Sequence, residues 1–247
     1  MGVASVLAIW WGLTLGATAE ARIISPVLVP SPMEVIRGLP SLFTERALLA
    51  SIAATLKRVI SGFGLAILIG VPLGILAGAY RKFDAATTPL SLFARNVPVA
   101  VLIPLTILWF GIDELQKSMF IFIATMPFVF HDAARAVGGI HQRYVETAET
   151  LGASPRQVLA KVLVPLALPG IYSSLRGLFG LAFGYIMLAE LVNAEHGLGY
   201  LLMASQRRGL NEHIFAVLLL IGALAYGIDR VLLWFERGLF PYREGAE

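Results

Sequence analysis

Long apolar stretches separated by short polar segments dominate the chain. Six stretches approach the ~20 residues that a helix needs to cross the hydrocarbon core of a membrane. They cover residues 3–19, 59–80, 97–112, 117–138, 168–192 and 214–235. The third is short and contains Pro98 and Pro104, which leaves its depth in the membrane open. The pattern predicts an all-α membrane protein, with residues 1–247 forming a single transmembrane domain of about six helices.

The first stretch has two interpretations. Ala17-Thr18-Ala19 is similar to the cleavage site of a secretory signal peptide. However, no basic residues precede the apolar run, and the run from Val3 to Ala19 is long for a signal peptide. We therefore prefer a retained first span, and its abrupt start predicts a short cytoplasmic leader before it.

The longest segment outside the spans lies between the first and second of them. Its prolines predict an extended stretch, followed by a helix from about Pro32 to Leu39. A second helix is expected to begin at about Glu45.

Composition supports the membrane assignment. The chain is 57% hydrophobic and only 14% charged, whereas a soluble domain carries about 25% charged residues. The net charge of +3 is too small to indicate nucleic-acid binding. Because cysteine is absent, disulfides, thiolate metal sites and cysteine nucleophiles are excluded.

Basic residues predict the orientation in the membrane. One set, in the shorter loops, is expected to be cytoplasmic: Arg81, Lys82, Arg95, Arg135, Arg143, Arg156, Lys161, Arg230, Arg237 and Arg243. The other set falls on the opposite side: Arg22, Arg37, Arg46, Lys57, Arg58, Lys117, Arg207 and Arg208. Lys57 and Arg58 fit this arrangement poorly and have no account from the sequence. In this orientation both termini and the loop 139–167 face the cytoplasm.

Glycines recur at a spacing of four residues in two spans. Gly70, Gly74 and Gly78 lie in the second span, and Gly180 and Gly184 lie in the fifth. Small residues four apart let helix backbones approach closely, so helix packing is the preferred interpretation and pore lining the alternative.

The polar loop 139–167 predicts two short helices. In the first, Val145, Ala148 and Leu151 form one apolar stripe, while Glu146 and Glu149 lie on another face. Gly152 is expected to end this helix in the left-handed conformation.

The second helix of the loop has a complete start signal. Ser154 is the predicted N-cap, Pro155 occupies the first helical position, and Gln157 completes a capping box. Pro165 and Pro169 are expected to end this helix just before the fifth span. Such a hinged pair with an apolar stripe indicates a docking surface, or a cover over the inner ends of the spans. A DNA-binding helix-turn-helix is disfavoured by the adjacent spans.

Residues 146–165, ETAETLGASPRQVLAKVLVP, resemble the EAA motif of permease subunits in ATP-binding-cassette importers. Glu146, Ala148, Gly152 and Pro165 match that pattern, whereas Thr147 replaces an alanine. Val162 and Val164 stand where the pattern has isoleucine and leucine.

The similarity extends along most of the chain. VPSPMEV, GVPLGILAG, VPVAVLIPLTILWFGI, AELVNAEHGLGYLL and DRVLLWFER resemble the nitrate/sulfonate/taurine/bicarbonate branch of these permeases. FHDAARAV, which includes His131 and Asp132, departs from that branch and leaves their roles open. The resemblance implies the fold of a type I importer permease in the bacterial inner membrane.

The resemblance also implies partners. Such permeases work as pairs, here a homodimer, with two cytoplasmic ATPase subunits and a periplasmic solute-binding protein. ATP and magnesium would be bound by the ATPase, because this chain has no G-x-x-x-x-G-K-[ST] loop and is not expected to be an enzyme. GLGY at residues 197–200 reads as a turn rather than a phosphate cradle. The implied ATPase contact consists of Glu146, Thr147, Ala148, Gly152, Ala153 and Ser154, with Pro165 in the connection to the fifth span.

Candidates for the translocation path are Arg176, Glu190, Phe183 and Trp109. Glu190 is ionisable and close to an apolar run, so a solute contact and a structural hydrogen bond are equal alternatives. Arg176 could meet an anion or extend to the cytoplasmic interface. Trp109 is best interpreted as part of an interfacial aromatic belt, with a gate as the lesser alternative. His131 and Asp132 alone make a poor metal site, and no metal ligands are proposed.

The expected function is therefore transport of a small anion such as a sulfonate, taurine, nitrate or bicarbonate. The same machinery carrying an uncharged or aromatic vitamin or pyrimidine precursor is the first alternative. A secondary transporter that needs no ATPase is the second, although the deep spans carry few charges and no convincing repeat. A membrane scaffold would have no use for the cytoplasmic loop.

Overall fold

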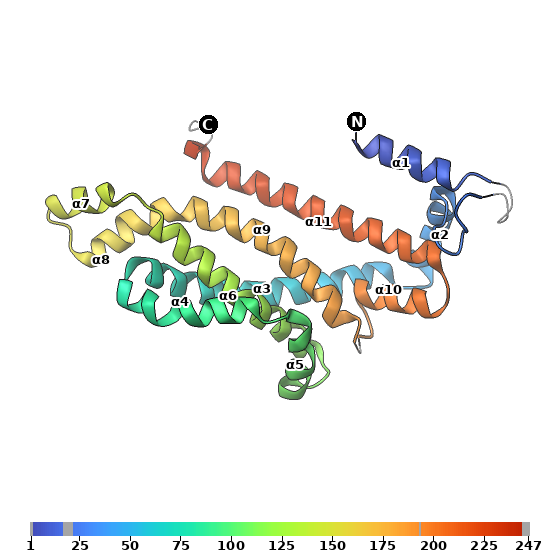
Figure 1. Ribbon diagram of the computed structural model, residues 1–247, viewed down its shortest axis with the longest axis horizontal. Helices are drawn as coiled ribbons and strands as arrows, with labels where there is room; N and C mark the ends of the chain where they lie inside the picture. The colour runs from blue at the N-terminus through green and yellow to red at the C-terminus, as the bar shows by residue number, and fades with distance from the viewer. Residues whose placement is uncertain (1, 17–21, 193, 244–247) are drawn as a thin grey trace. The chain divides into compact units, whose positions relative to one another are not determined.

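The computed structural model describes residues 2–16, 22–192 and 194–243, and this part of the chain is built from helices (Figure 1). The predicted all-α class is confirmed. The longer helices are α1 (Gly2–Leu13), α2 (Pro32–Thr44), α3 (Leu48–Ala79), α4 (Arg81–Asn96), α5 (Leu102–Phe110), α6 (Glu114–Gly138), α7 (Gln142–Thr150), α9 (Val164–Glu190), α10 (Leu198–Arg207) and α11 (Asn211–Leu239). Short pieces are a 3₁₀ turn (Val99–Val101), α8 (Pro155–Val158), a π-helix (Leu159–Leu163) and a second 3₁₀ turn (Pro241–Arg243).

The contacts divide the chain into two compact units. The first contains the chain up to Leu56 and the segment Glu190–Ala225. The second contains Lys57–Ala189 and the segment from Tyr226 onward.

The described residues contain four or five candidate spans, compared with the six predicted from the sequence. Within the described residues, four helical stretches are long and apolar enough to cross a membrane, namely α3, α6, Pro155–Glu190 and α11. A fifth arises if α4 and the following Val99–Phe110 count as one span bent by 87°. The predicted span 3–19 corresponds to α1, which has 12 residues, and the proposed cleavage motif at 17–19 lies outside the described residues.

The bend lies at the start of the predicted span 97–112, where Pro98 was expected to break the helix. A residue before proline is pushed into an extended conformation, and Val97 has φ −69 and ψ 125 next to Pro98. The helix α4 ends there, and the chain restarts with the 3₁₀ turn and α5. Helix α4 was not predicted, because Arg81–Asn96 contains too many polar residues to form an apolar run.

The segment before the second span forms α2 and then α3. Helix α2 begins at Pro32 as predicted, with Ser31 and Glu34 forming a capping box. It continues beyond the predicted end at Leu39 to Thr44, and Pro40 lies inside it. The helix expected from about Glu45 and the span 59–80 are one continuous helix, α3, of 32 residues.

Close packing of α3 on α6 forms the middle of the second unit. A Cβ added at Gly74 or Gly78 would collide with the carbonyl oxygen of Phe130 or Ala134 in α6, and one at Gly70 would lie 2.9 Å from Val129 Cγ1. Larger side chains at these positions would force the two backbones apart. At Gly180 and Gly184, by contrast, an added Cβ meets nothing within 4 Å in the described chain.

Candidate functional site

Helices α7 and α8 are joined by an elbow, which we define as residues 146–154, from the last part of α7 to the residue before α8. Gly152 has φ +82, a conformation that strains any side chain, and its N–H donates to the Glu149 carbonyl at 2.9 Å. The Ala153 N–H donates to the Ala148 carbonyl at 3.0 Å, which closes the end of α7. Ser154 N–H then donates to Gln157 Oε1 at 2.8 Å in the predicted capping box. The predicted stop and restart of the helix are confirmed.

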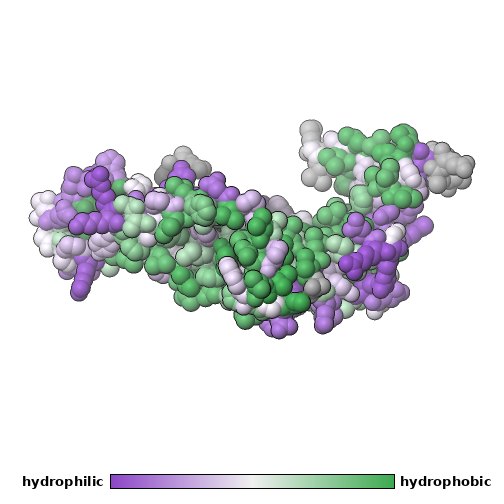
Figure 2. All heavy atoms as spheres, turned by 60° about the horizontal axis from the view of Figure 1, so that its bottom comes forward, coloured by the Kyte–Doolittle hydropathy of each residue, from purple (hydrophilic) through white to green (hydrophobic). Residues whose placement is uncertain are grey.

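The elbow exposes a large apolar side chain among polar ones. The Leu151 side chain is 82% exposed, although Val145 and Ala148 of the same stripe are partly covered. Glu146 and Ser154 are also exposed, and Thr147 donates its hydroxyl to the Arg143 carbonyl at 2.7 Å. Figure 2 shows mostly hydrophilic side chains at this end of the unit, next to the mostly hydrophobic helices that continue from it.

The expectation that Pro165 and Pro169 end the second helix is wrong. Pro155–Glu190 is one helical stretch, with the π-helix Leu159–Leu163 directly before Pro165. A proline clashes with the carbonyl one turn earlier and removes a donor. The wider π turn, in which Val164 N–H donates to the Leu159 carbonyl, adjusts the backbone where that conflict begins. The elbow is therefore joined to α9 without a flexible break.

Arg176 lies in an ion-pair network between α9 and α11. Its Nε is 3.0 Å from Asp229 Oδ1, and its Nη1 donates to Glu236 Oε2 at 2.5 Å. Tyr172, one turn earlier, donates its hydroxyl to the Leu232 carbonyl at 2.9 Å. Two carboxylates already compensate the guanidinium charge, which argues against Arg176 as a receptor for an anion.

The aromatic candidates differ in exposure. Phe183 is 2% exposed and stacks on Phe179 at 6.4 Å, so it belongs to a packed cluster rather than to an open path. Trp109 is 59% exposed and makes an edge contact with Phe110. His131 and Asp132 line two different cavities of the second unit.

Glu190 lies in a buried polar cluster of the first unit, which we call the Glu190 cluster: Thr55, Glu190, Gly197, Leu198 and Gly199. The Thr55 hydroxyl donates to the carboxylate at 2.8 Å, and the Gly199 N–H donates to it at 2.9 Å. The Leu198 N–H donates to Thr55 Oγ1 at 3.0 Å. Glu190, 1% exposed, thus holds the first turn of α10. The geometry favours the structural alternative.

Gly197 lets the backbone approach the Glu190 carboxylate. Its φ is +138, and an added Cβ would lie 2.5 Å from the carboxyl carbon of Glu190. The turn expected at 197–200 is therefore the start of α10, and its backbone N–H groups form part of the Glu190 cluster. The sequence did not predict α10 or the role of Thr55, although the glycines after Glu190 were a usable signal.

Arg58, which had no account from the sequence, is paired within the second unit. It is 2% exposed, its Nε donates to Glu114 Oε2 at 2.6 Å, and its Nη2 donates to Glu114 Oε1. A two-point contact of this kind compensates a buried guanidinium. Arg58 therefore fixes α3 to the start of α6.

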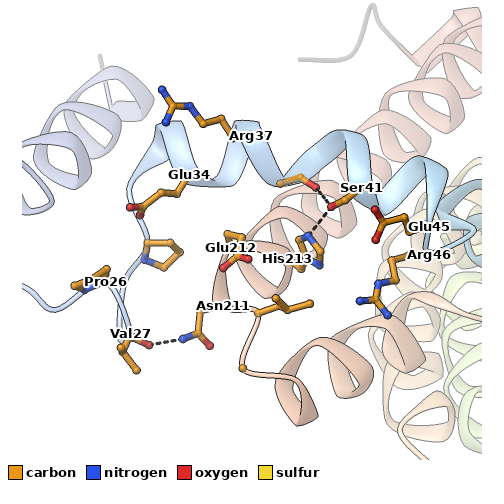
Figure 3. A pocket seen from close by; sticks show the side chains of 14 residues that line it. Pro26, Val27, Glu34, Arg37, Ser41, Glu45, Arg46, Asn211, Glu212 and His213 are labelled. Carbon is orange, nitrogen blue, oxygen red and sulfur yellow. Dashed lines mark hydrogen bonds between the residues drawn. The ribbon is translucent and has the colours of Figure 1, made fainter. Parts of the chain in front are cut away.

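The first unit also contains a cavity of about 710 Å³ between α2 and the start of α11 (Figure 3). His213, 5% exposed, lies in its wall with Nε2 at 2.8 Å from Ser41 Oγ. Because the Ser41 hydroxyl donates to the Gly38 carbonyl, Nε2 is the donor to Ser41. His213 Nδ1 and Arg46 Nε are buried and have no hydrogen-bond partner among the described residues. The wall of the cavity also carries the charged side chains of Glu34, Arg37 and Glu45.

Comparison with protein families decides the identity of the chain. Residues 70–240, which include α6, the elbow and α9, match the family described as the binding-protein-dependent transport system inner membrane component. The chain belongs to this family. It is an ABC importer permease of the inner membrane.

Relatives and a solved structure agree with this assignment. The permease is 31% identical to the taurine transport system permease protein TauC of Escherichia coli over 97% of its own length and 87% of TauC. It is 30% identical to the bicarbonate transport system permease protein CmpB of Synechococcus elongatus, over 78% of its length and 70% of CmpB. Its fold matches a chain of the MetNI methionine ABC transporter in an inward-facing conformation, with a TM-score of 0.72 and 23% identity over 81% of the permease and 97% of that chain.

Proposed function

We propose that the permease is the transmembrane subunit of an ATP-driven importer for a small anion such as a sulfonate, taurine, nitrate or bicarbonate. A periplasmic binding protein delivers the solute, two cytoplasmic ATPase subunits bind ATP and magnesium, and two copies of the permease enclose the path. The taurine and bicarbonate systems of the relatives TauC and CmpB support this substrate class.

The elbow carries the coupling part of the proposal. Leu151 is 82% exposed at the end of α7, and burial of such a side chain by a partner would contribute about 2 kcal/mol. Glu146, Thr147, Ala148, Gly152, Ala153 and Ser154 form this contact with the ATPase, and Pro165 lies at the start of α9. Because Pro155–Glu190 is continuous, displacement of the elbow moves the start of a membrane span.

The cavity beside His213 supports docking of a binding protein. In the predicted orientation α2 and the start of α11 face the periplasm. The cavity is lined by exposed charged side chains, among them Arg37 and Glu45. Polar side chains of a docking protein would pair with them.

The test is purification of the tagged permease from its native membranes in mild detergent, followed by reconstitution with the proteins that copurify. We expect an ATPase subunit in the complex and ATP-driven solute uptake when the binding protein is added. Gly152→Pro should uncouple ATP hydrolysis from uptake, because proline cannot adopt φ +82 and removes the N–H that donates to Glu149. Glu146→Ala should have a weaker effect of the same kind.

Matched controls are Gly138→Ala, at a helical glycine with open space, and Glu149→Ala, at the other exposed glutamate of α7. Normal coupling in Gly152→Pro would contradict the elbow mechanism. Uptake without any ATPase subunit would indicate a secondary transporter instead. Uptake restricted to an uncharged vitamin or pyrimidine precursor would be consistent with the importer mechanism but would contradict the proposal that the solute is an anion.

A further inference from the structure

Arg95 lies at the end of α4, immediately before the break that separates α4 from α5. Its position is about 20 Å along the helix axis from Arg81, at the ~1.5 Å rise per residue of an α-helix. The guanidinium carbon lies 4.9 Å from the centroid of the Phe128 ring, and Phe128 is near the middle of α6. If α6 crosses the membrane, the Arg95 charge is deep in the hydrocarbon region, far from either end of that helix.

Two other arginines have carboxylate partners, because Arg58 contacts Glu114 and Arg176 contacts Asp229 and Glu236. No ion pair within the described residues includes Arg95. Its guanidinium lies over the face of the Phe128 ring and close enough to His131 to interact with it electrostatically. A ring face stabilises a cation only in part. A charged arginine at this depth is costly, and such residues generally face a solute path or a water-filled cavity.

The backbone next to Arg95 supports the same conclusion. Asn96 and Pro98 are exposed, and Val97 between them is extended, so non-helical backbone is open at the junction of the bent pair. At membrane depth, irregular backbone is tolerated where it is buried in protein or lines an aqueous cavity. Broken helices of this kind form solute sites in membrane transporters. Because this break is not covered by its own chain, it is suited to line a path.

We propose that Arg95 binds the anionic headgroup of the transported solute, a sulfonate, carboxylate or bicarbonate, at the α4–α5 break. The planar guanidinium donates two N–H groups to two oxygens of one headgroup. The Phe128 ring, which has no lone pairs to accept these donors, lies on one side of the guanidinium, and Arg95 is only half-buried. This inference rests on the proposed importer function and names the residue that recognises its cargo, a role that the ion-paired Arg176 does not fill.

The test uses the reconstituted complex of permease, ATPase and binding protein, with radiolabelled taurine as the probe and bicarbonate as a second probe. For Arg95→Gln we expect taurine moved per ATP hydrolysed to fall at least about tenfold, as for loss of a charge-assisted hydrogen bond. Arg81→Gln, at the opposite end of α4, is the matched control and should retain the wild-type ratio.

Two further variants test the proposal even if Arg95→Gln fails to fold or assemble. Arg95→Lys keeps the charge without the fork of two donors, so taurine uptake should persist with a raised KM. Phe128→Leu should raise KM less, because the charge remains and only its support is lost. An unchanged KM in Arg95→Lys would overturn the proposal even if Arg95→Gln did not assemble.

The outcomes separate this inference from the proposed function. If the wild-type complex contains no ATPase or shows no ATP-driven uptake, the importer function fails irrespective of Arg95. If the wild type accumulates taurine or bicarbonate and Arg95→Gln does so equally well, the anion site fails and the importer function stands. Accumulation of uncharged solutes alone by the wild type would also overturn the anion site.

Discussion

The Glu190 cluster and the elbow differ in where their polar and apolar groups find partners. In the cluster, a 1% exposed carboxylate accepts hydrogen bonds from Thr55 and from the first turn of α10. At the elbow, Leu151 is 82% exposed and Glu146 faces solvent. Both regions depend on a glycine with positive φ, Gly197 in one and Gly152 in the other.

This difference separates stability from coupling. Groups that find partners inside the chain stabilise it, and their loss leaves buried polar atoms without hydrogen bonds. Groups that face outward contribute little to the folded chain and remain available to another molecule. Variants of the Glu190 cluster should therefore unfold more easily, whereas variants of the elbow should fold normally and transport poorly.

The largest loss of stability is expected for Gly197→Ala. Positive φ costs a non-glycine residue about 1–2 kcal/mol, and the new Cβ would lie 2.5 Å from the Glu190 carboxyl carbon. With displacement of that carboxylate, the total should reach about 3 kcal/mol in the free energy of unfolding. Thermal unfolding in detergent measures it. Gly209→Ala, with φ +69 and open space, should show only the first effect; equal losses would contradict the contact with Glu190.

Glu190→Gln should be next, at about 2 kcal/mol, because one of the two oxygens that accept hydrogen bonds from Thr55 and Gly199 becomes a donor. A double-mutant cycle with Thr55→Val isolates their shared hydrogen bond. We expect a coupling free energy of about 1 kcal/mol between the two sites. Additive effects would show that Glu190 is held by its other contacts, and Glu149→Gln on exposed α7 should leave stability unchanged.

Gly152→Ala tests the elbow by the same backbone argument. Its φ of +82 predicts a cost of about 1–2 kcal/mol, with no steric term because an added Cβ meets nothing within 4 Å. The loss should be smaller than that of Gly197→Ala in the same unfolding assay. A cost as large as that of Gly197→Ala would mean that the elbow, too, is packed within the chain.

Local signals predicted local structure well. The helix start at Pro32, the cap at Ser154 and the stop at Gly152 depend on residues within a few positions of one another, and all three occur. The prolines were harder to interpret, because Pro98 breaks a helix whereas Pro165 is accommodated by the π turn before it. A single proline does not specify which outcome its surroundings allow.

Long-range pairing could not be predicted from these signals. Thr55 and Glu190 are 135 residues apart, and Arg58 and Glu114 are 56 apart. Nothing in the periodicity of either segment selects its partner, so Glu190 remained ambiguous and Arg58 unexplained. From the sequence, Arg95 was only one of the basic residues that predict orientation. The structure shows that it lies beside the helix break at Val97 and over the Phe128 ring.

Glu34 is a more exposed counterpart of Glu190, and it predicts a small pH effect. Hydrogen bonds from Arg22 and from the Ser31 backbone lower the pKa of the Glu34 carboxyl from 4.5 to about 2. Its contribution is therefore fully present above about pH 4.5 and is lost as pH falls towards 2. Unfolding midpoints of wild type and Glu34→Gln should converge over that range. A difference that stays constant with pH would mean that the carboxylate charge does not matter.

The smallest change in stability is expected for Leu151→Ser, which tests the comparison most directly. A side chain that is 82% exposed loses almost no burial on truncation, so unfolding should shift by less than about 0.5 kcal/mol. If the ATPase covers Leu151 in the complex, its affinity for the permease should nevertheless fall by about tenfold or more. Leu239→Ser, at another exposed leucine in α11, is the control. Unchanged ATPase affinity in Leu151→Ser would mean that exposure at the elbow does not mark the coupling surface, and that the contact depends on Glu146 and its neighbours instead.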